Sequence, residues 1–241
     1  MAGHSKWANI KHTKARMDAK RSKVFAKIAR EITIAARLGG GDSDMNPRLR
    51  LALLKARGAN MPADNITRAI QRGTGEGVAA SFEELSYEIY GPHGAAILAE
   101  ISTDNRNRTS ADIRAILTRN DGKMATAGSV SRLFHRKGQI MIARDAANED
   151  ELMELALEAG ADDFKAESEG YEVLTAPEDF EAVHQVIESK EIAMETAEIT
   201  QLPEMLAPVS SEAELEKVHK LVDLLEDHDD VQSVFTNAEM A

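Results

Sequence analysis

The basic residues near the start of the chain have the residue types and spacing needed to contact a nucleic-acid backbone. Each Lys or Arg side chain can neutralise one phosphate and release its condensed counterions. The only tryptophan lies among them, and its ring can either stack on a base or pack into the protein. The alternative is a solvated basic face. The predicted nucleic-acid-binding residues are Lys6, Trp7, Lys11, Lys14, Arg16, Lys20, Lys23, Lys27 and Arg30.

A second group of candidate residues is the pair Arg106 and Arg108, in the run TDNRNRT (103–109). We expect a strand before this run and a helix from about Ser110, with Thr109 and Asp112 forming a capping box. Free backbone N–H groups at a helix N-terminus favour an anion, so the two arginines are candidates for a phosphate or carboxylate site. The alternative is that they pair with local carboxylates.

Other residue patterns exclude most kinds of catalysis. The chain has no cysteine, so disulfides and thiolate chemistry are absent, and its seven histidines do not have metal-ligand spacing. The glycine-rich runs GGG and GTGEG lack the context of a phosphate-binding loop. We find no nucleophile–base arrangement. The sequence therefore predicts a protein that is not an enzyme and needs no cofactor or metal.

The charge is strongly segregated along the chain. Residues 1–72 contain 16 Lys and Arg against 5 Asp and Glu, whereas residues 146–241 contain 4 against 27. These counts give a net charge of +11 at the start and −23 at the end, within a total of −12. The basic part is the expected site for a polyanion, and the acidic part is a candidate surface for a basic protein partner.

The elements that must position these residues fall into three groups. Apolar residues at helical spacing predict a helix from Ser22, stopped by the glycines at 39–41, a second helix after Asn46-Pro47, and a third from about Pro62 to Arg72. Alternation then predicts strands at 85–91 and 94–102. Residues 139–200 follow the order β-α-β-β-α-β, which is typical of a ferredoxin-like unit.

The last predicted elements, a strand at 204–209, a helix at 211–227 and a strand at 231–236, have no partner of their own. We therefore expect them to return to the second unit. The predicted fold is multi-domain α+β. A basic helical domain (1–77) precedes an α+β domain (78–134 plus 204–241), into which a ferredoxin-like α+β domain (135–203) is inserted.

No apolar run approaches the roughly 20 residues that a membrane helix needs, and the start lacks the apolar region of a secretory signal. We expect no membrane partner and a cytoplasmic location, which the absence of cysteine fits.

Several ordered motifs together resemble the YebC family. They are GHSKW (3–7), GGGD (39–42), NPRLR (46–50), NMPADNITRAIQRG (60–73), YGPHGAAIL (90–98), TDNRNRT (103–109), GSV…LFHRKG (128–138) and LLEDHDDVQSVFTN (224–237). The resemblance covers nearly the whole chain. It implies a three-domain cytoplasmic protein without catalytic activity. Members are described as transcriptional regulators, and relatives include mitochondrial translational activators.

Two hypotheses for the function follow. The first is a DNA-binding transcriptional regulator whose basic domain docks on duplex phosphates. The second is a ribosome-associated translation factor that binds rRNA or tRNA and relieves stalling, for example at proline runs. The first domain has no recognisable helix-turn-helix, which weakens the case for sequence-specific DNA recognition. The acidic third domain would be repelled by an RNA-lined cavity unless it faces protein or solvent.

Overall fold

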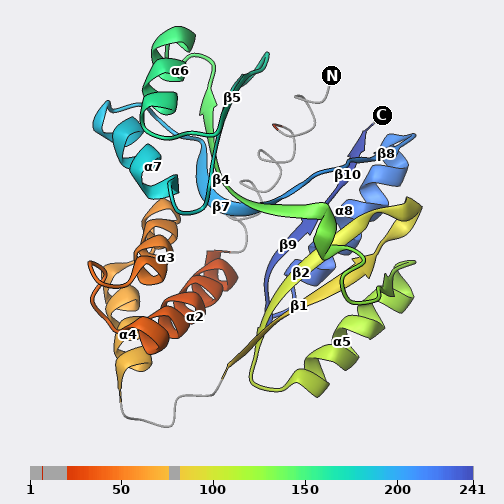
Figure 1. Cartoon of the computed structure of the whole chain (residues 1–241). Coiled ribbons are helices and arrows are strands. Elements are labelled where there is room, and N and C mark those ends of the chain that lie inside the picture. The colour runs from red at the N-terminus through yellow and green to blue at the C-terminus, as the bar shows by residue number, and fades with distance from the viewer. Residues whose placement is uncertain (1–6, 8–20, 76–81, 241) are drawn as a thin grey trace.

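The computed structural model describes Trp7, residues 21–75 and residues 82–240. Figure 1 shows a group of helices and two separate sheets, each accompanied by helices. This is the multi-domain α+β architecture that the sequence predicts, so the predicted fold class is confirmed. Within the described part of the chain, no helix combines the length and apolar composition required to cross a bilayer.

The first domain consists of three helices, α2 (Arg21–Gly39), α3 (Pro47–Gly58) and α4 (Ala63–Thr74). Ile32 of α2 and Leu49 of α3 are fully buried in the core that the three helices share. Gly73 allows the close packing of α4 on α2, because a Cβ atom there would lie 2.4 Å from the Thr33 carbonyl oxygen. The domain therefore has a core of its own.

Asn46 joins the end of α2 to the start of α3. Its side-chain oxygen accepts a hydrogen bond from the Leu49 amide, which makes Asn46 the N-cap of α3. Its side-chain amide donates to the carbonyls of Ala35 and Gly40, each at 2.8 Å. The Asn46-Pro47 start that the sequence predicts for this helix is confirmed.

The second domain is a four-stranded antiparallel sheet with two helices. The strand order is β3-β1-β2-β9, and the helices share one hydrophobic core with one face of the sheet. Its elements are β1 (Glu83–Tyr90), β2 (Ala96–Thr103), α5 (Arg106–Arg119), β3 (Lys123–Met124), α8 (Glu212–Glu226) and β9 (Val231–Thr236). Because β9 pairs with β2, the end of the chain returns to this sheet.

The third domain lies in the chain between those parts and has the strand order β5-β6-β4-β7. This antiparallel order, with a helix after the first and third strands, is the ferredoxin-like arrangement. Its elements are β4 (Phe134–Ala143), α6 (Glu149–Glu158), β5 (Asp163–Ala166), β6 (Gly170–Thr175), α7 (Phe180–Ser189) and β7 (Thr196–Pro203). Strands β4 and β7 pair from Phe134↔Pro203 to Met141↔Thr196.

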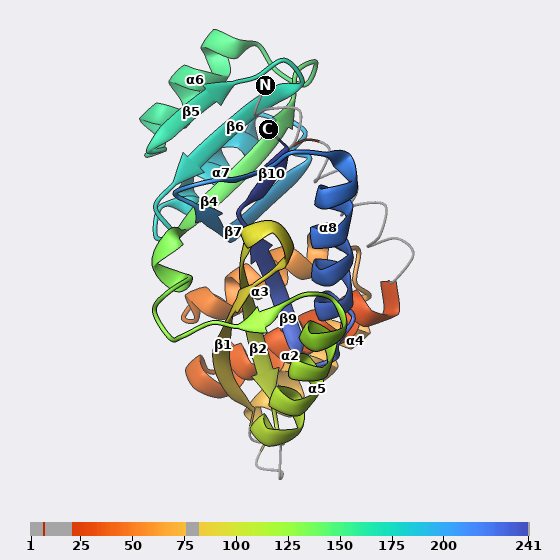
Figure 2. The ribbon, with the colours of Figure 1, turned by 90° about the vertical axis from the view of Figure 1, so that its right-hand side faces the viewer.

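The paired strands β4 and β7 also connect the second and third domains. Phe134 at the start of β4 is buried in a cluster with Leu98 of β2 and Val130, on the sheet face opposite the two helices. The ladder therefore begins within the second domain and continues into the third. Figure 2 shows the third domain above the second, with the helices of the first domain behind the sheet of the second.

Two local predictions differ from the structure. Helix α5 begins at Arg106 rather than near Ser110, because Asn105 is the N-cap and accepts the Arg108 amide hydrogen at 3.1 Å. The predicted Thr109–Asp112 capping box is therefore wrong. The strand predicted at 204–209 is observed only at Ala207–Val209, as β8. It pairs in parallel with β10 (Ala238–Met240), a strand that the sequence did not indicate.

Candidate nucleic-acid interface

The predicted nucleic-acid-binding residues divide into two groups. Lys6, Lys11, Lys14, Arg16 and Lys20 lie outside the described residues. Trp7, Lys23, Lys27 and Arg30 have defined positions, and the three cations lie on α2 at the spacing i, i+4 and i+7. This spacing places the three side chains on one face of the helix.

Trp7 packs into the protein. Only 4% of the residue is exposed. Its ring lies against the backbone of Gly170 at the start of β6, where a Cβ atom would come within 2.3 Å of Cζ2. Of the two roles that the sequence left open, the structure shows packing, and it shows that Trp7 contacts the third domain.

Lys23, Lys27 and Arg30 contact the last residue of α8 and the four residues that follow it, 226–230, which we call the acidic turn. The Lys23 Nζ donates to the Asp227 carbonyl oxygen at 3.0 Å, and the Lys27 Nζ donates to the Glu226 carbonyl oxygen at 2.7 Å. The Arg30 Nη1 donates to the carbonyls of Asp229 at 2.9 Å and Ser102 at 2.7 Å. The basic face of α2 therefore meets the second domain, and nucleic-acid binding by these three cations stays a prediction.

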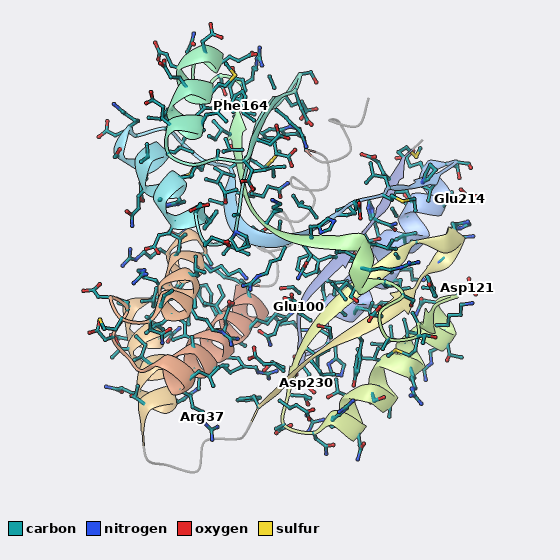
Figure 3. All side chains as sticks on the ribbon, in the orientation of Figure 1. Arg37, Glu100, Asp121, Phe164, Glu214 and Asp230 are labelled. Carbon is teal, nitrogen blue, oxygen red and sulfur yellow. The ribbon has the colours of Figure 1, made fainter. Side chains whose placement is uncertain are left out.

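Asp230 is the centre of this contact. Its side chain is 6% exposed, and its Oδ1 accepts a hydrogen bond from Arg30 at 3.3 Å. Its Oδ2 accepts from Thr109 at 2.7 Å, Arg108 at 3.1 Å and Thr103 at 3.2 Å. Burial alone raises the pKa of Asp230, but the hydrogen bonds from Thr109, Arg108 and Thr103 outweigh it and hold the pKa below its usual value. Figure 3 shows Asp230 on the side of the second domain that faces α2.

The predicted anion-binding pair is engaged with acidic residues of the chain itself. Arg106 contacts Glu83 at 3.4 Å, whereas Arg108 contacts Asp104 at 2.8 Å and Asp230 at 3.1 Å. The hydrogen bonds from Arg108 to Asp230 and Asp104 raise the pKa of the guanidinium. The structure thus shows the local pairing that was the alternative, and binding of an external anion by the two arginines stays a prediction.

A cleft of about 670 Å³ lies where the three domains meet, and it was not predicted from the sequence. Charged residues from all three domains line it: Glu31, Arg48, Lys55, Glu84, Glu100, Arg136, Glu178 and Glu198. Burial raises the pKa of Glu198, an effect that Lys55 opposes and Glu31 reinforces. Because these residues lie far apart in the chain, no local motif could have indicated them. Figure 3 shows Glu100 on the side of the second domain that faces the first.

Ion pairs join the first domain to each of the other two domains. Arg48 of α3 pairs with Glu84 of β1, and Arg50 pairs with Glu181 of α7 at 2.7 Å. Two leucines of α3, Leu51 and Leu54, pack against the core of the third domain. The first domain therefore contacts both other domains through hydrogen bonds and ion pairs. It also makes apolar contacts with the third domain through these two leucines.

Comparison with known proteins identifies the family. The model of the TACO1/YebC protein N-terminal domain matches residues 5–76, and the model of the TACO1/YebC second and third domain matches residues 82–238. The chain belongs to the TACO1/YebC family. The resemblance found in the sequence is thereby confirmed.

Curated relatives and a solved structure agree with this membership. A "Probable transcriptional regulatory protein" of Carboxydothermus hydrogenoformans is 54% identical, covering 100% of this chain and 99% of that protein. One of the same name from Syntrophobacter fumaroxidans is 51% identical, covering 98% and 95%. The crystal structure of "a Conserved Hypothetical Protein Aq1575 from Aquifex Aeolicus" has a TM-score of 0.82 at 42% identity, covering 94% of this chain and 93% of that one.

Within the described residues, no group of three or more His, Asp or Glu side chains is placed to hold a metal ion. Asp230 and Glu181 pair with arginines, Asp230 also accepts a hydrogen bond from the Thr109 hydroxyl, and Glu88 accepts one from the Val130 backbone amide.

Proposed function

We propose that this protein is a non-enzymatic, nucleic-acid-binding regulator of gene expression, and that its first domain makes the main contact with the phosphate backbone. The observation that carries the proposal is the segregation of charge, with a net +11 in residues 1–72 and −23 in residues 146–241. Residues 21–72, which the structure describes, contain 11 Lys and Arg against 4 Asp and Glu, and their three helices share a hydrophobic core.

Exposed arginines on each of the three helices of the first domain support this role. Arg37 lies in the last turn of α2, Arg57 in the last turn of α3, and Arg68 and Arg72 on α4. Cations spread over such a surface bind the backbone of nucleic acids with little dependence on sequence. The third domain would repel phosphates, so the polyanion would approach from the side of the first domain.

The finer proposal is a DNA-binding regulator of transcription. It draws on the relatives, whose printed names contain the words "transcriptional regulatory protein". Phosphate contacts alone do not distinguish duplex DNA from structured RNA, so a translation factor acting on rRNA or tRNA is the competing outcome of the test.

Cross-linking in living cells, followed by sequencing of the attached nucleic acid, tests this proposal. Enrichment of genomic DNA over an untagged control is the expected result. Enrichment of rRNA or tRNA would replace the transcriptional role with the translational one. Recovery of neither above the control would remove the proposal as a whole. A variant with Lys6, Lys11 and Lys14 changed to Glu is the matched control, because it retains the rest of the chain.

A further inference from the structure

The basic face of α2 is covered in this structure by groups that resemble the ligands it would bind. Its three cations at positions 23, 27 and 30 donate hydrogen bonds to the carbonyl groups of residues 226, 227 and 229 in the acidic turn, and to the carboxylate of Asp230. Carbonyl and carboxylate oxygens are acceptors, as phosphate oxygens are. The acidic turn therefore occupies the donors that a nucleic-acid backbone would use.

The charge of the acidic turn adds a second obstacle. Four of its five residues are acidic, namely Glu226, Asp227, Asp229 and Asp230. Phosphates approaching this face would be repelled by the nearby carboxylates, and the repulsion is strongest at low salt. While the contact is closed, a polyanion is excluded from the face both by occupancy and by charge.

Separation at this contact would leave the hydrophobic core of the first domain in place, because no residue of the acidic turn belongs to that core. The first domain keeps its own core, in which Ile32, Leu49 and Ala69 pack together. The contact with the acidic turn consists of hydrogen bonds and the ion pair of Arg30 with Asp230. The bonds that Lys23 and Arg30 make to the carbonyls of Asp227 and Asp229 are exposed to solvent, whereas the bond from Lys27 and the ion pair are part-buried. Exposed contacts of this kind are weak and sensitive to salt. The packing of Leu51 and Leu54 on the third domain lies elsewhere, so it need not be lost.

We propose that the acidic turn is an internal competitor of the nucleic acid: it covers the basic face of α2 in the closed form, and a phosphate backbone displaces it. Binding and separation of the first domain from the acidic turn are then one coupled event. This inference rests on the proposed function, because it concerns how access to the same surface is regulated. In the free protein, three cations of α2 are occupied by the acidic turn and become available to phosphates only when the turn is displaced.

The absence of cysteine allows a direct test. Ala26 of α2 and Asp229 of the acidic turn are both exposed, and the turn uses the carbonyl of Asp229, not its carboxylate, to accept from Arg30. The double variant Ala26→Cys, Asp229→Cys keeps Lys23, Lys27 and Arg30. Joining the two thiols with a short bismaleimide locks the closed form. The matched control is the same variant treated with N-ethylmaleimide, which modifies both thiols without joining them.

Binding is measured on a mixed-sequence DNA duplex and on a single-stranded RNA, over a range of salt concentrations. We expect the locked form to bind at least tenfold more weakly than the control. On duplex its salt slope should be smaller by roughly 2 to 3, because three phosphate contacts at about 0.9 each are lost. Equal affinity and slope in the two forms would overturn the inference and leave the proposed function intact. Failure of both forms to bind would overturn both, and failure of the thiols to join would show that the closed contact is not populated.

A second measurement follows the separation itself. With a fluorescent donor and acceptor on the two thiols, saturating nucleic acid should lower the transfer efficiency. Binding that leaves the efficiency unchanged would contradict the coupling.

Discussion

Replacing Asp230 with Asn tests the network that joins the first and second domains. The Oδ2 of this carboxylate accepts hydrogen bonds from Thr103, Thr109 and Arg108. Its Oδ1 accepts the hydrogen bond from Arg30 of the first domain. An Asn side chain can place its oxygen at the Oδ2 position, but its amide then faces the Arg30 guanidinium, so two donors meet. The charge that strengthens the remaining bonds is also lost.

The magnitude follows from these contacts. A hydrogen bond to a charged group contributes about 1.5–3 kcal/mol, and one is lost outright while the others are weakened. Arg108 is half exposed, so solvent screens its share. We therefore expect Asp230→Asn to lower the free energy of unfolding by about 2 to 3 kcal/mol at neutral pH. Asp229→Asn is the matched control, since that side chain is exposed, and its effect should stay within about 0.5 kcal/mol.

The effect should depend on pH in a defined direction. The folded-state pKa of Asp230 lies below its ordinary value, so the stabilisation is fully present above the unfolded pKa of about 3.9. It is lost as the pH falls through the folded pKa. Urea unfolding followed by circular dichroism should show a full difference at pH 7 that shrinks below about pH 4. A variant as stable as the Asp229 control at pH 7, or a difference that grows on acidification, would refute this account of the network.

Two further predictions concern the first domain. Changing Lys6, Lys11 and Lys14 to Glu should weaken the binding of DNA and RNA and make that binding less dependent on salt, without lowering the melting temperature, because these three lysines are predicted to contact phosphates. Binding equal to that of the parent protein would contradict this. Gly73→Ala should lower the free energy of unfolding by about 1–2 kcal/mol, because the clash with the Thr33 carbonyl exceeds the helix-propensity gain of about 1 kcal/mol. Gly58→Ala should be neutral or stabilising, because a Cβ atom at this position would have no other atom within 4 Å. Thermal unfolding of the two variants tests this difference.

Much of the fold could be predicted because local patterns encode it. The apolar spacing from Val24 to Ala36 gave α2, and the unpartnered elements after residue 203 indicated the insertion that the pairing of β9 with β2 shows. The start of α5 was missed because its first residues, such as Arg106 and Arg108, are polar and do not show the apolar spacing of a helix. The N-cap is Asn105, which was not considered as one. Strand β10 was missed because it is short and pairs only with β8.

The candidate site was less predictable, because its contacts join distant segments. Lys27 and Glu226 are 199 positions apart, and the other bonds from α2 to the acidic turn span similar separations. The sequence indicates that residues 20–30 are basic and that residues 226–230 are acidic. Only the folded arrangement shows that they meet. The same reason hides the cleft, whose lining comes from all three domains.

The central claim is that the first domain makes the main contact with nucleic acid, and mapping the cross-linked peptides by mass spectrometry tests it most directly. The full-length protein is cross-linked to nucleic acid by ultraviolet light in cells and digested with a protease. Peptides carrying a nucleotide adduct are then assigned to the sequence. The account predicts that most adducts fall within residues 1–72, the part with net charge +11. Adducts confined to residues 146–241, or an absence of adducts in the first domain while others are abundant, would contradict it.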